Sequence, residues 1–230
     1  MTVTRSARRS RPFRLLPLLS AAGLAGLVLG GCTSIIPGAD RNPPQLYELR
    51  PASGFAANLP RIRAQLLVET PTASASLRSS RIAVKMQPTK LDYLVESEWT
   101  DLATNLLQTL LVESFDNSSR IAGVARQGSG LRTDYLLKSD LREFHAEMYK
   151  GAPARIRIRI HVRLVRWTDR DIVASRTFEA SAPLAGESND AIVAGFDTAI
   201  GGVLNRVVEW SLRRMHRESR RRAAARRTGG

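Results

Sequence analysis

The residue with the most distinctive chemical setting is Cys32, the single cysteine of this 230-residue chain. It ends the tetrapeptide Leu29-Gly30-Gly31-Cys32, in which a branched apolar residue and two small residues precede the thiol. A lipoprotein signal peptidase reads this pattern, because small residues let the scissile backbone enter a narrow active site and the cysteine thiol is acylated before cleavage. The sequence therefore predicts that Cys32 is lipidated and becomes the new N-terminus.

The residues before Cys32 have the layout of an export signal. Residues 15–29 form an apolar run, which is shorter than the roughly 20 residues that cross a bilayer as a helix. The leader before this run contains no acidic residue and five arginines, Arg5, Arg8, Arg9, Arg11 and Arg14. We expect residues 1–31 to be a lipoprotein signal peptide. The alternative is an ordinary signal followed by an unrelated cysteine.

A second set of candidate residues lies between 155 and 164, where arginine alternates with aliphatic residues. The period of two predicts a β-strand that buries its aliphatic face and shows positive charge on the other. We define the arginine row as Arg155, Arg157, Arg159 and Arg163. It is a candidate contact surface for a partner. The alternative is a solvated sheet face with cross-strand ion pairs, in which Glu179 of the next strand faces Arg159.

The net charge of +14 is concentrated at the two ends of the chain. The predicted signal carries +5 and residues 213–230 carry +7, which leaves +2 for residues 32–212. A basic chain often binds nucleic acid, but an exported protein meets none, so we expect no nucleic-acid partner. We predict that residues 213–230 form a basic, disordered tail. It either touches anionic lipid headgroups or serves only solubility.

The remaining polar residues do not form a catalytic or metal-binding pattern. His145, His161 and His216 are spread over two predicted strands and the tail, and none has a second ligand at metal spacing. The acids Glu96, Glu98 and Asp101 are explained by the start of a predicted helix. We therefore expect a protein that is not an enzyme and has no cofactor and no metal.

Two helices and a set of strands are predicted to carry these residues. The first helix begins with Ser97 as N-cap and has an apolar stripe from Trp99 to Phe115. The second begins at Ser188 or Asn189, has a stripe from Ile192 to Trp210, and contains Gly195, Gly201 and Gly202, which either allow close packing or kink it. Strands are expected at 45–50, 62–70, 81–86, 91–95, 121–125, 134–149, 155–167 and 171–181.

This order of elements favours an α+β fold, with an antiparallel or mixed sheet and both helices packed on one face of a single domain. The folded domain is expected at residues 45–212. Residues 32–44 are rich in proline, glycine and polar residues and are expected to be a flexible tether from the lipidated cysteine.

Several short segments, in this order and spacing, resemble the ABC-type transport auxiliary lipoproteins, the PqiC-like group. All of these segments lie between residues 45 and 212. The first two are residues 67–86, which include Arg81-Ile82-Ala83-Val84, and Leu91-Asp92-Tyr93, which is followed by Trp99. The others are Asp134-Tyr135-Leu136-Leu137, Leu141-Arg142-Glu143-Phe144, Arg176-Thr177-Phe178 and residues 196–210. The arginine row and the basic tail depart from the family pattern, so the chemistry of the partner is open.

The resemblance implies an accessory subunit of an MCE-type system, which moves lipids between the inner and outer membranes. It places the protein in the cell envelope, anchored by lipid to the outer membrane and facing the periplasm, with an MCE-domain protein as partner. The alternative is a structural lipoprotein of outer-membrane assembly, for lipopolysaccharide or β-barrel proteins. The sequence leaves the oligomeric state open, homo-oligomers included.

Overall fold

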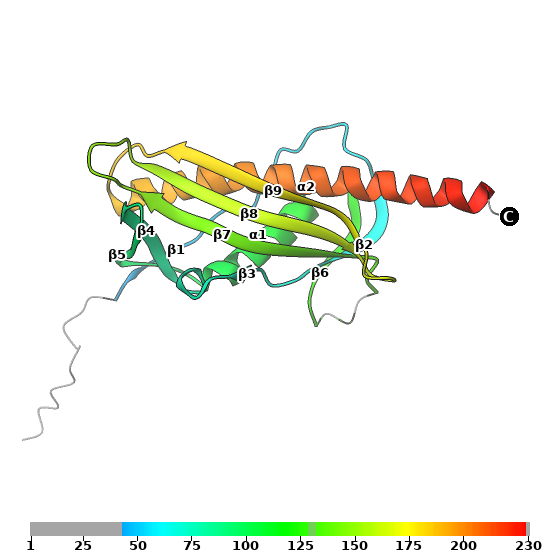
Figure 1. Cartoon of the computed structure of the whole chain (residues 1–230), viewed down its shortest axis with the longest axis horizontal. Coiled ribbons are helices and arrows are strands. Elements are labelled where there is room, and N and C mark those ends of the chain that lie inside the picture. Colours follow the sequence, from blue (N-terminus) through cyan, green and yellow to red (C-terminus); the bar gives the residue numbers. More distant parts are fainter. Residues whose placement is uncertain (1–42, 129, 131, 229–230) are drawn as a thin grey trace, which may run out of the picture. The chain divides into compact units, whose positions relative to one another are not determined.

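Three long strands from the second half of the chain form the centre of the fold (Figure 1). This computed structural model describes residues 43–128, 130 and 132–228. The three strands are β7 (Tyr135–Glu147), β8 (Arg155–Arg166) and β9 (Ile172–Pro183), and they pair antiparallel in chain order. The alternation in β8 buries its aliphatic residues and turns the arginines to the opposite face, as the period of two predicted.

The other strands extend this sheet through parallel and antiparallel pairs. At one end of β7, the pair β4 (Arg81–Gln87) and β5 (Lys90–Trp99) is antiparallel, and β1 (Gln45–Tyr47) runs parallel to β5. At the other end, β2 (Ile62–Val68) runs parallel to both β7 and β6 (Ile121–Arg126). The short β3 (Thr72–Ala73) pairs with the middle of β7, just before the 3-10 turn η1 (Ala75–Leu77). In the described residues this makes a mixed sheet of nine strands.

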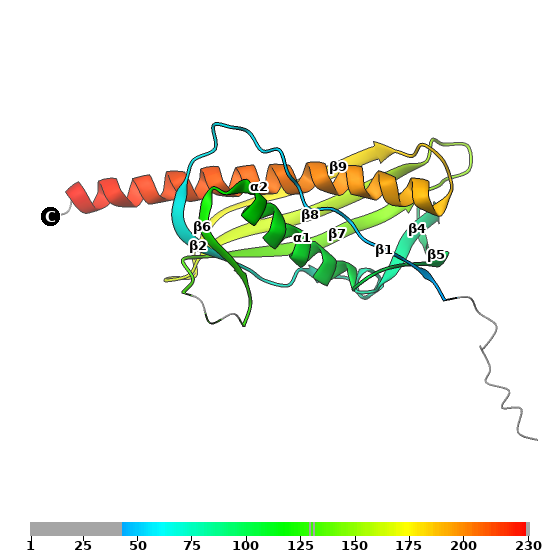
Figure 2. The same ribbon diagram turned by 180° about the vertical axis from the view of Figure 1, so that it is seen from behind.

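Both helices, α1 (Ala103–Ser118) and α2 (Asn189–Thr228), cover the same face of the sheet (Figures 1 and 2). The core lies between them and the sheet and includes Phe115, Ile158 and Phe196, each at most 1% exposed. Residues 43–230 form one compact unit. The prediction of an α+β fold, with a mixed sheet and two helices on one face, is confirmed.

An aromatic cluster joins the sheet to α2. Trp99, Phe144 and Phe196 have ring centroids 4.9 to 5.6 Å apart. The sequence analysis was wrong to place Trp99 on a helix, because Trp99 is the last residue of β5 and α1 begins only at Ala103. Ser97 is likewise a buried strand residue and not an N-cap; its hydroxyl accepts a 2.6 Å hydrogen bond from the Asn189 side chain.

A β-bulge at Arg142 decides which residues of β7 enter the core. Before the bulge Leu141 faces the helices opposite Ile160, and after it Glu143 lies opposite Arg159 and Phe144 opposite Ile158. One extra residue in a strand shifts every following side chain to the other face. The bulge therefore directs Glu143 to the helix-free face and lets Phe144 join the aromatic cluster.

Of the three glycines in α2, Gly195 is the one that packs closely. A β-carbon at this position would lie 2.7 Å from the Leu184 side chain and 3.0 Å from Ile156. At Gly201 a β-carbon would meet nothing within 4 Å. The helix runs through all three positions, so the sequence expectation of close packing holds at Gly195 only.

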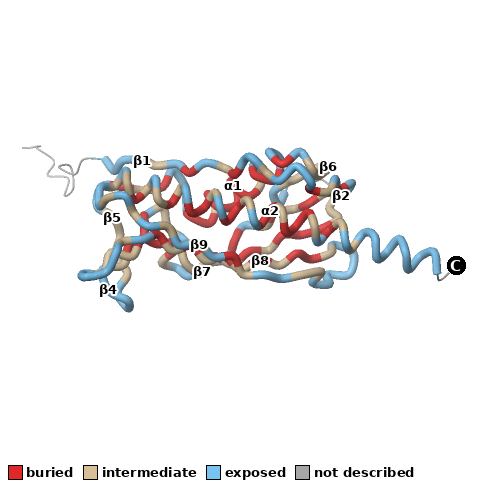
Figure 3. The backbone as a smooth tube through the Cα atoms, turned by 90° about the horizontal axis from the view of Figure 1, so that it is seen from above, coloured by how far each residue is buried: buried red, intermediate tan, exposed pale blue. Residues whose placement is uncertain are grey.

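The helix α2 continues beyond the domain end that the sequence suggested. Its last buried residue is Met215, and residues 217–228, which we name the overhang, are exposed except for the half-buried Glu218 (Figure 3). The sequence analysis expected a disordered tail from residue 213, and the structure has helix up to Thr228. By length and hydropathy α2 could cross a membrane, but half of its apolar window is buried inside this domain.

Candidate interaction surfaces

The lipidation site Cys32 and all other residues up to Asn42 lie outside the described residues. Lipidation, the signal peptide and the tether therefore stay predictions. The described chain starts beside the N-terminus of α2, because the Tyr47 hydroxyl of β1 donates a 2.7 Å hydrogen bond to Asp190. This contact raises the pKa of Tyr47 above its usual range.

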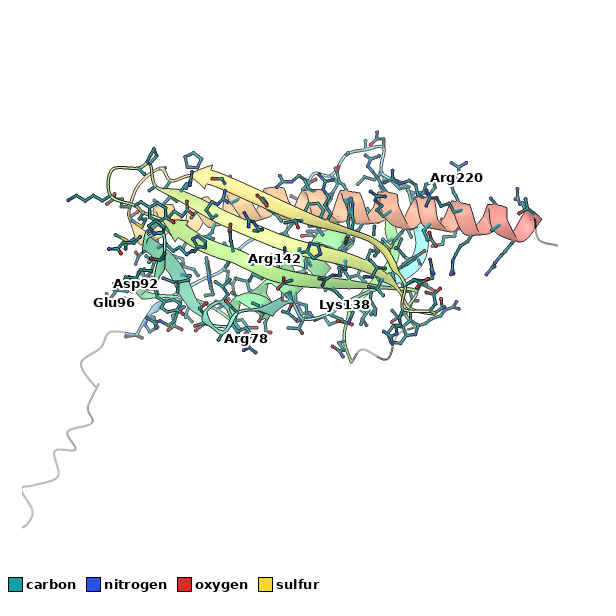
Figure 4. All side chains as sticks on the ribbon, in the orientation of Figure 1. Arg78, Asp92, Glu96, Lys138, Arg142 and Arg220 are labelled. Atoms are coloured by element: carbon teal, nitrogen blue, oxygen red, sulfur yellow. The ribbon has the colours of Figure 1, made fainter. Side chains whose placement is uncertain are left out.

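The arginine row lies along β8 on the face of the sheet opposite the helices. Each of its members has a neighbour on β7 and another on β9, because β8 is the middle strand of the three. Figure 4 shows the same face from the front, with Lys138 and Arg142 of β7 pointing out of it. The structure thus brings all four arginines of the row onto one surface that no helix covers.

Most of the row is paired with carboxylates of the neighbouring strands. Glu143 lies 3.4 Å from both Arg157 and Arg159, and Arg159 also reaches Glu179 at 3.1 Å. The predicted pairing of Arg159 with Glu179 is therefore confirmed. The carboxylate of Glu143 bridges two like charges that stand two residues apart on one strand, and this reduces their mutual repulsion.

The pair of Arg155 and Glu147 sits at the end of the row, with a 2.6 Å hydrogen bond from Nε to the carboxylate. Burial alone would raise the pKa of Glu147, but the hydrogen bond and the charge of Arg155, together with Tyr149 and His145, outweigh it, so this pKa lies below its usual range. The same bond raises the pKa of Arg155. Both groups are therefore held in their charged forms.

Arg163 differs from the other three arginines. In the described part of the chain no carboxylate forms an ion pair with it, and the residues opposite are Lys138 and Ser175. Lys138 is itself paired with Glu69 at 3.1 Å. The positive charge that this face offers to a partner is thus centred on Arg163.

The two strand histidines lie on the same face but not together. His145 is buried, and its Nε2 is 3.7 Å from Glu147, whereas His161 makes a 2.9 Å hydrogen bond with Thr177. Burial lowers the pKa of both. Within the described residues, no three histidine, cysteine or acidic side chains are grouped as metal ligands.

A second basic surface, which sequence reasoning interpreted as a disordered tail, is the overhang of α2. Arg217, Arg220, Arg221, Arg226 and Arg227 are exposed there. Among the described residues, the ion pairs of this segment involve only Arg222 and Glu218. The other five arginines have no carboxylate partner in that part of the chain.

A half-buried ion-pair cluster holds the base of the overhang against the sheet. Arg166, at the end of β8, contacts Asp169 of the following turn and makes a 2.6 Å hydrogen bond to Glu218 of α2. Burial alone would lower the pKa of Arg166, but these two partners outweigh it and raise the pKa. Sequence reasoning missed this cluster; its one signal is that Glu218 is the only acid after residue 212.

Two cavities accompany these surfaces. One of about 380 Å³ lies beside the overhang and is lined by four arginines, Arg63, Arg132, Arg166 and Arg222, with Asp134 as its one acid. The other, of about 660 Å³, lies between residues 50–53 and α2 at Gly201-Gly202. Arg50 forms an ion pair with Asp197 at this second cavity. Arg206 donates a hydrogen bond to the backbone carbonyl of Glu179 in β9.

Comparison with known proteins places this arrangement in a known group. A family model described as the ABC-type transport auxiliary lipoprotein component matches residues 47–208. An uncharacterized protein of Bradyrhizobium diazoefficiens is 28% identical over 169 residues, which are 72% of this chain and 44% of that protein. The chain thus spans less than half the length of this curated relative.

Two solved structures have the same architecture. The crystal structure of protein XCC0632 from Xanthomonas campestris is similar with a TM-score of 0.73 and 30% identity, over 76% of this chain and 99% of that one. A second crystal structure, of an uncharacterized protein, has a TM-score of 0.52 at 17% identity, over 77% and 99% of the two chains, and shows the fold alone.

Proposed function

The chain belongs to the family of ABC-type transport auxiliary lipoprotein components, and we propose that it is a non-enzymatic accessory subunit of an MCE-type system for intermembrane lipid transport. The observation that carries the proposal is the family match, which covers residues 47–208 and therefore almost the whole folded unit. Its partner is an MCE-domain protein associated with an ABC transporter.

The helix-free face of the sheet is the surface that we assign to this partner. Both helices pack on the opposite face, so β7, β8 and β9 are open to a second protein along their length (Figures 1 and 2). The charges of this face alternate in sign, since Glu143, Glu147 and Glu179 stand among the arginines. Alternating charges favour one register of a partner over another more than they add affinity.

The predicted lipid anchor places the domain in the cell envelope. With Cys32 acylated, the domain is held at a membrane, for which we propose the periplasmic side of the outer membrane. Stable anchoring needs two or more signals or acyl chains, at about 0.8 kcal/mol per buried methylene. Radiolabelled palmitate should enter the wild type and not Cys32→Ser, and equal labelling of both contradicts the assignment.

Affinity capture of the full chain from detergent-solubilised envelope, followed by mass spectrometry, tests the partner. Recovery of an MCE-domain protein with a permease and an ATPase supports the proposal. Recovery of β-barrel or lipopolysaccharide assembly proteins instead supports the structural alternative. Phospholipid that copurifies tightly with the domain itself contradicts the accessory role and indicates a lipid carrier.

Arg163→Glu tests the assigned face with the least disturbance to the fold, because Arg163 has no ion pair to lose in the described chain. We expect slower association with the captured partner, with a difference that shrinks at high salt, and an unchanged melting temperature. Arg78→Glu, which reverses an exposed arginine outside the row, is the matched control. Equal association of both variants contradicts the assignment of this face.

A further inference from the structure

The overhang of α2 combines a high positive charge with an absence of packing. Its exposed arginines 217, 220, 221, 226 and 227 lie within 11 residues, and none has an ion pair with another described residue. An isolated helix of this length is marginal in water, and like charges one turn apart oppose it further. The one acid of the segment, Glu218, pairs with Arg166 and Arg222 and forms no ion pair with these five arginines.

The composition of the overhang points to the kind of partner. Apart from arginine, residues 219–228 are only serine, alanine and threonine. Protein interfaces depend on a few anchors, most often tryptophan, tyrosine and arginine, which are buried in well-packed pockets. Residues 219–228 contain no aromatic or large apolar residue that could pack around their arginines. Exposed guanidinium groups in such a setting suit a surface of many negative charges, such as phospholipid headgroups.

The spacing of these arginines makes the charge continuous along the helix. Arg213, Arg217, Arg220 and Arg227 are separated by four, three and seven residues, so they follow one face. The inner side of the helix is fixed by Met215 in the core and by the ion pair of Glu218 with Arg166. The arginine face therefore points away from the sheet, and Figure 4 shows Arg220 directed outward from it.

The cavity at the base of the overhang adds to this basic end. Arg63, Arg132 and Arg166 line it, and Arg222 connects it with the overhang. Its volume of about 380 Å³ is large enough for a phosphate-bearing headgroup. The positive charges of the helix and of the cavity therefore lie at the same end of the domain.

We propose that this basic end, formed by the overhang of α2 and the arginine-lined cavity at its base, binds the surface of a bilayer containing anionic phospholipid. It lies at the far end of α2, which at 40 residues is about 60 Å long, from β1, where the chain enters the domain (Figure 1). The contact of the basic end with the bilayer is therefore separate from the predicted lipid anchor. It orients the domain relative to the membrane, and it does not depend on which protein binds the sheet.

Vesicle cosedimentation tests this directly with residues 43–230, which contain the whole described core as one compact unit and lack the predicted anchor. The probes are vesicles of phosphatidylglycerol and phosphatidylcholine in equal parts, and vesicles of phosphatidylcholine alone. We expect binding to the first and not to the second, and its loss in molar salt, where charges are screened within a few ångströms.

Two charge-matched variants locate the contact. R217Q/R220Q/R221Q/R226Q/R227Q removes five charges from the overhang, and glutamine keeps the helix propensity of arginine. Each arginine near an anionic surface contributes about 1 kcal/mol, and about 1.4 kcal/mol is a factor of ten in affinity. The loss of all five should therefore weaken binding by about a thousandfold. The control R78Q/K90Q/R142Q/K150Q/R176Q removes five charges elsewhere and should bind like the parent.

Three results overturn the proposal: no binding of the parent to anionic vesicles, equal binding to neutral vesicles, or equal weakening by both variants. The last result would mean that net charge, and not the basic end, drives the association. Circular dichroism of the variants keeps the test independent of folding, because both should retain the helix content and the melting temperature of the parent.

Discussion

The two segments of this protein that are rich in arginine lie in opposite environments. On β8 the arginines stand between two other strands, and three of the four are paired with Glu143, Glu147 or Glu179. On the overhang of α2 five arginines have no such pair among the described residues. A run of positive charge therefore says little about binding until its neighbours in space are known.

The difference follows from the geometry of the two elements. A central strand has neighbours about 4.8 Å away on both sides, so a carboxylate at an opposite or diagonal position of a neighbouring strand can compensate an arginine. A helix that extends beyond its sheet has neighbours only along its own chain. There the last acid is Glu218, which Arg166 and Arg222 already occupy.

The largest expected effect is on the core that holds both segments in place. Phe196→Ala removes a fully buried ring that contacts Trp99 and Phe144, and should lower the free energy of unfolding by roughly 3–5 kcal/mol. Trp99→Ala should cost a similar amount, although it acts from β5 and not from a helix. Urea denaturation measures the free energy of unfolding of both variants. A variant whose melting temperature stays within a degree or two of wild type contradicts the placement of its aromatic ring in the core.

A smaller effect is expected from the carboxylate that compensates the row. Glu143→Gln leaves Arg157 and Arg159 half-buried beside each other, and should cost about 1 kcal/mol. Glu179→Gln, whose side chain is half exposed, is the matched control and should cost less. In a double-mutant cycle, combining Glu143→Gln with Arg157→Gln should recover part of the loss; strict additivity contradicts the coupling.

The buried histidine of the same face predicts a dependence on pH. Burial, and then the charge of Lys85, lower the pKa of His145, while Glu143 and Glu147 oppose this shift. The unfolded chain, with a histidine pKa of about 6.5, takes up the proton first. Stability is therefore complete above that pH and falls as the pH drops through it towards the folded-state pKa.

His145→Gln should flatten this part of the stability profile, measured as melting temperature between neutral and mildly acidic pH. His161 has a lowered pKa for the same reason and retains part of the slope. A chain that ends at Glu218 keeps both histidines and should follow the wild-type profile. An unchanged slope in His145→Gln contradicts the assignment of the dependence to this residue.

The smallest effect on stability is expected from ending the chain at Glu218. Residues 219–228 are exposed, and the pair of Glu218 with Arg166 is retained, although the exposed ion pairs of Arg222 are lost. The free energy of unfolding should change by no more than about 0.5 kcal/mol, as for other surface changes. The truncated chain should lose vesicle binding at the same time. A large loss of stability would show that the overhang packs against the domain.

The sequence by itself determined the elements whose pattern is local. The period of two in 155–164 and the long apolar stripe from Ile192 onward are each explained by neighbouring residues, and the structure contains them. The α+β class and the pairing of Arg159 with Glu179 followed from these elements, because consecutive strands joined by a tight turn pair antiparallel.

Only the tertiary structure decided the features that depend on distant pairing. In the sequence, the apolar stripe of α1 continues towards the N-terminus as far as Trp99. The pairing of β5 with β1 and β4 nevertheless keeps Trp99 in the strand. The bulge at Arg142, which sends Glu143 to the arginine row and Phe144 to the core, exists only in register with β8. Three of the four arginines of the row are compensated, and five arginines of the overhang are not in the described residues, because charges separated in sequence interact only where the fold brings them within a few ångströms.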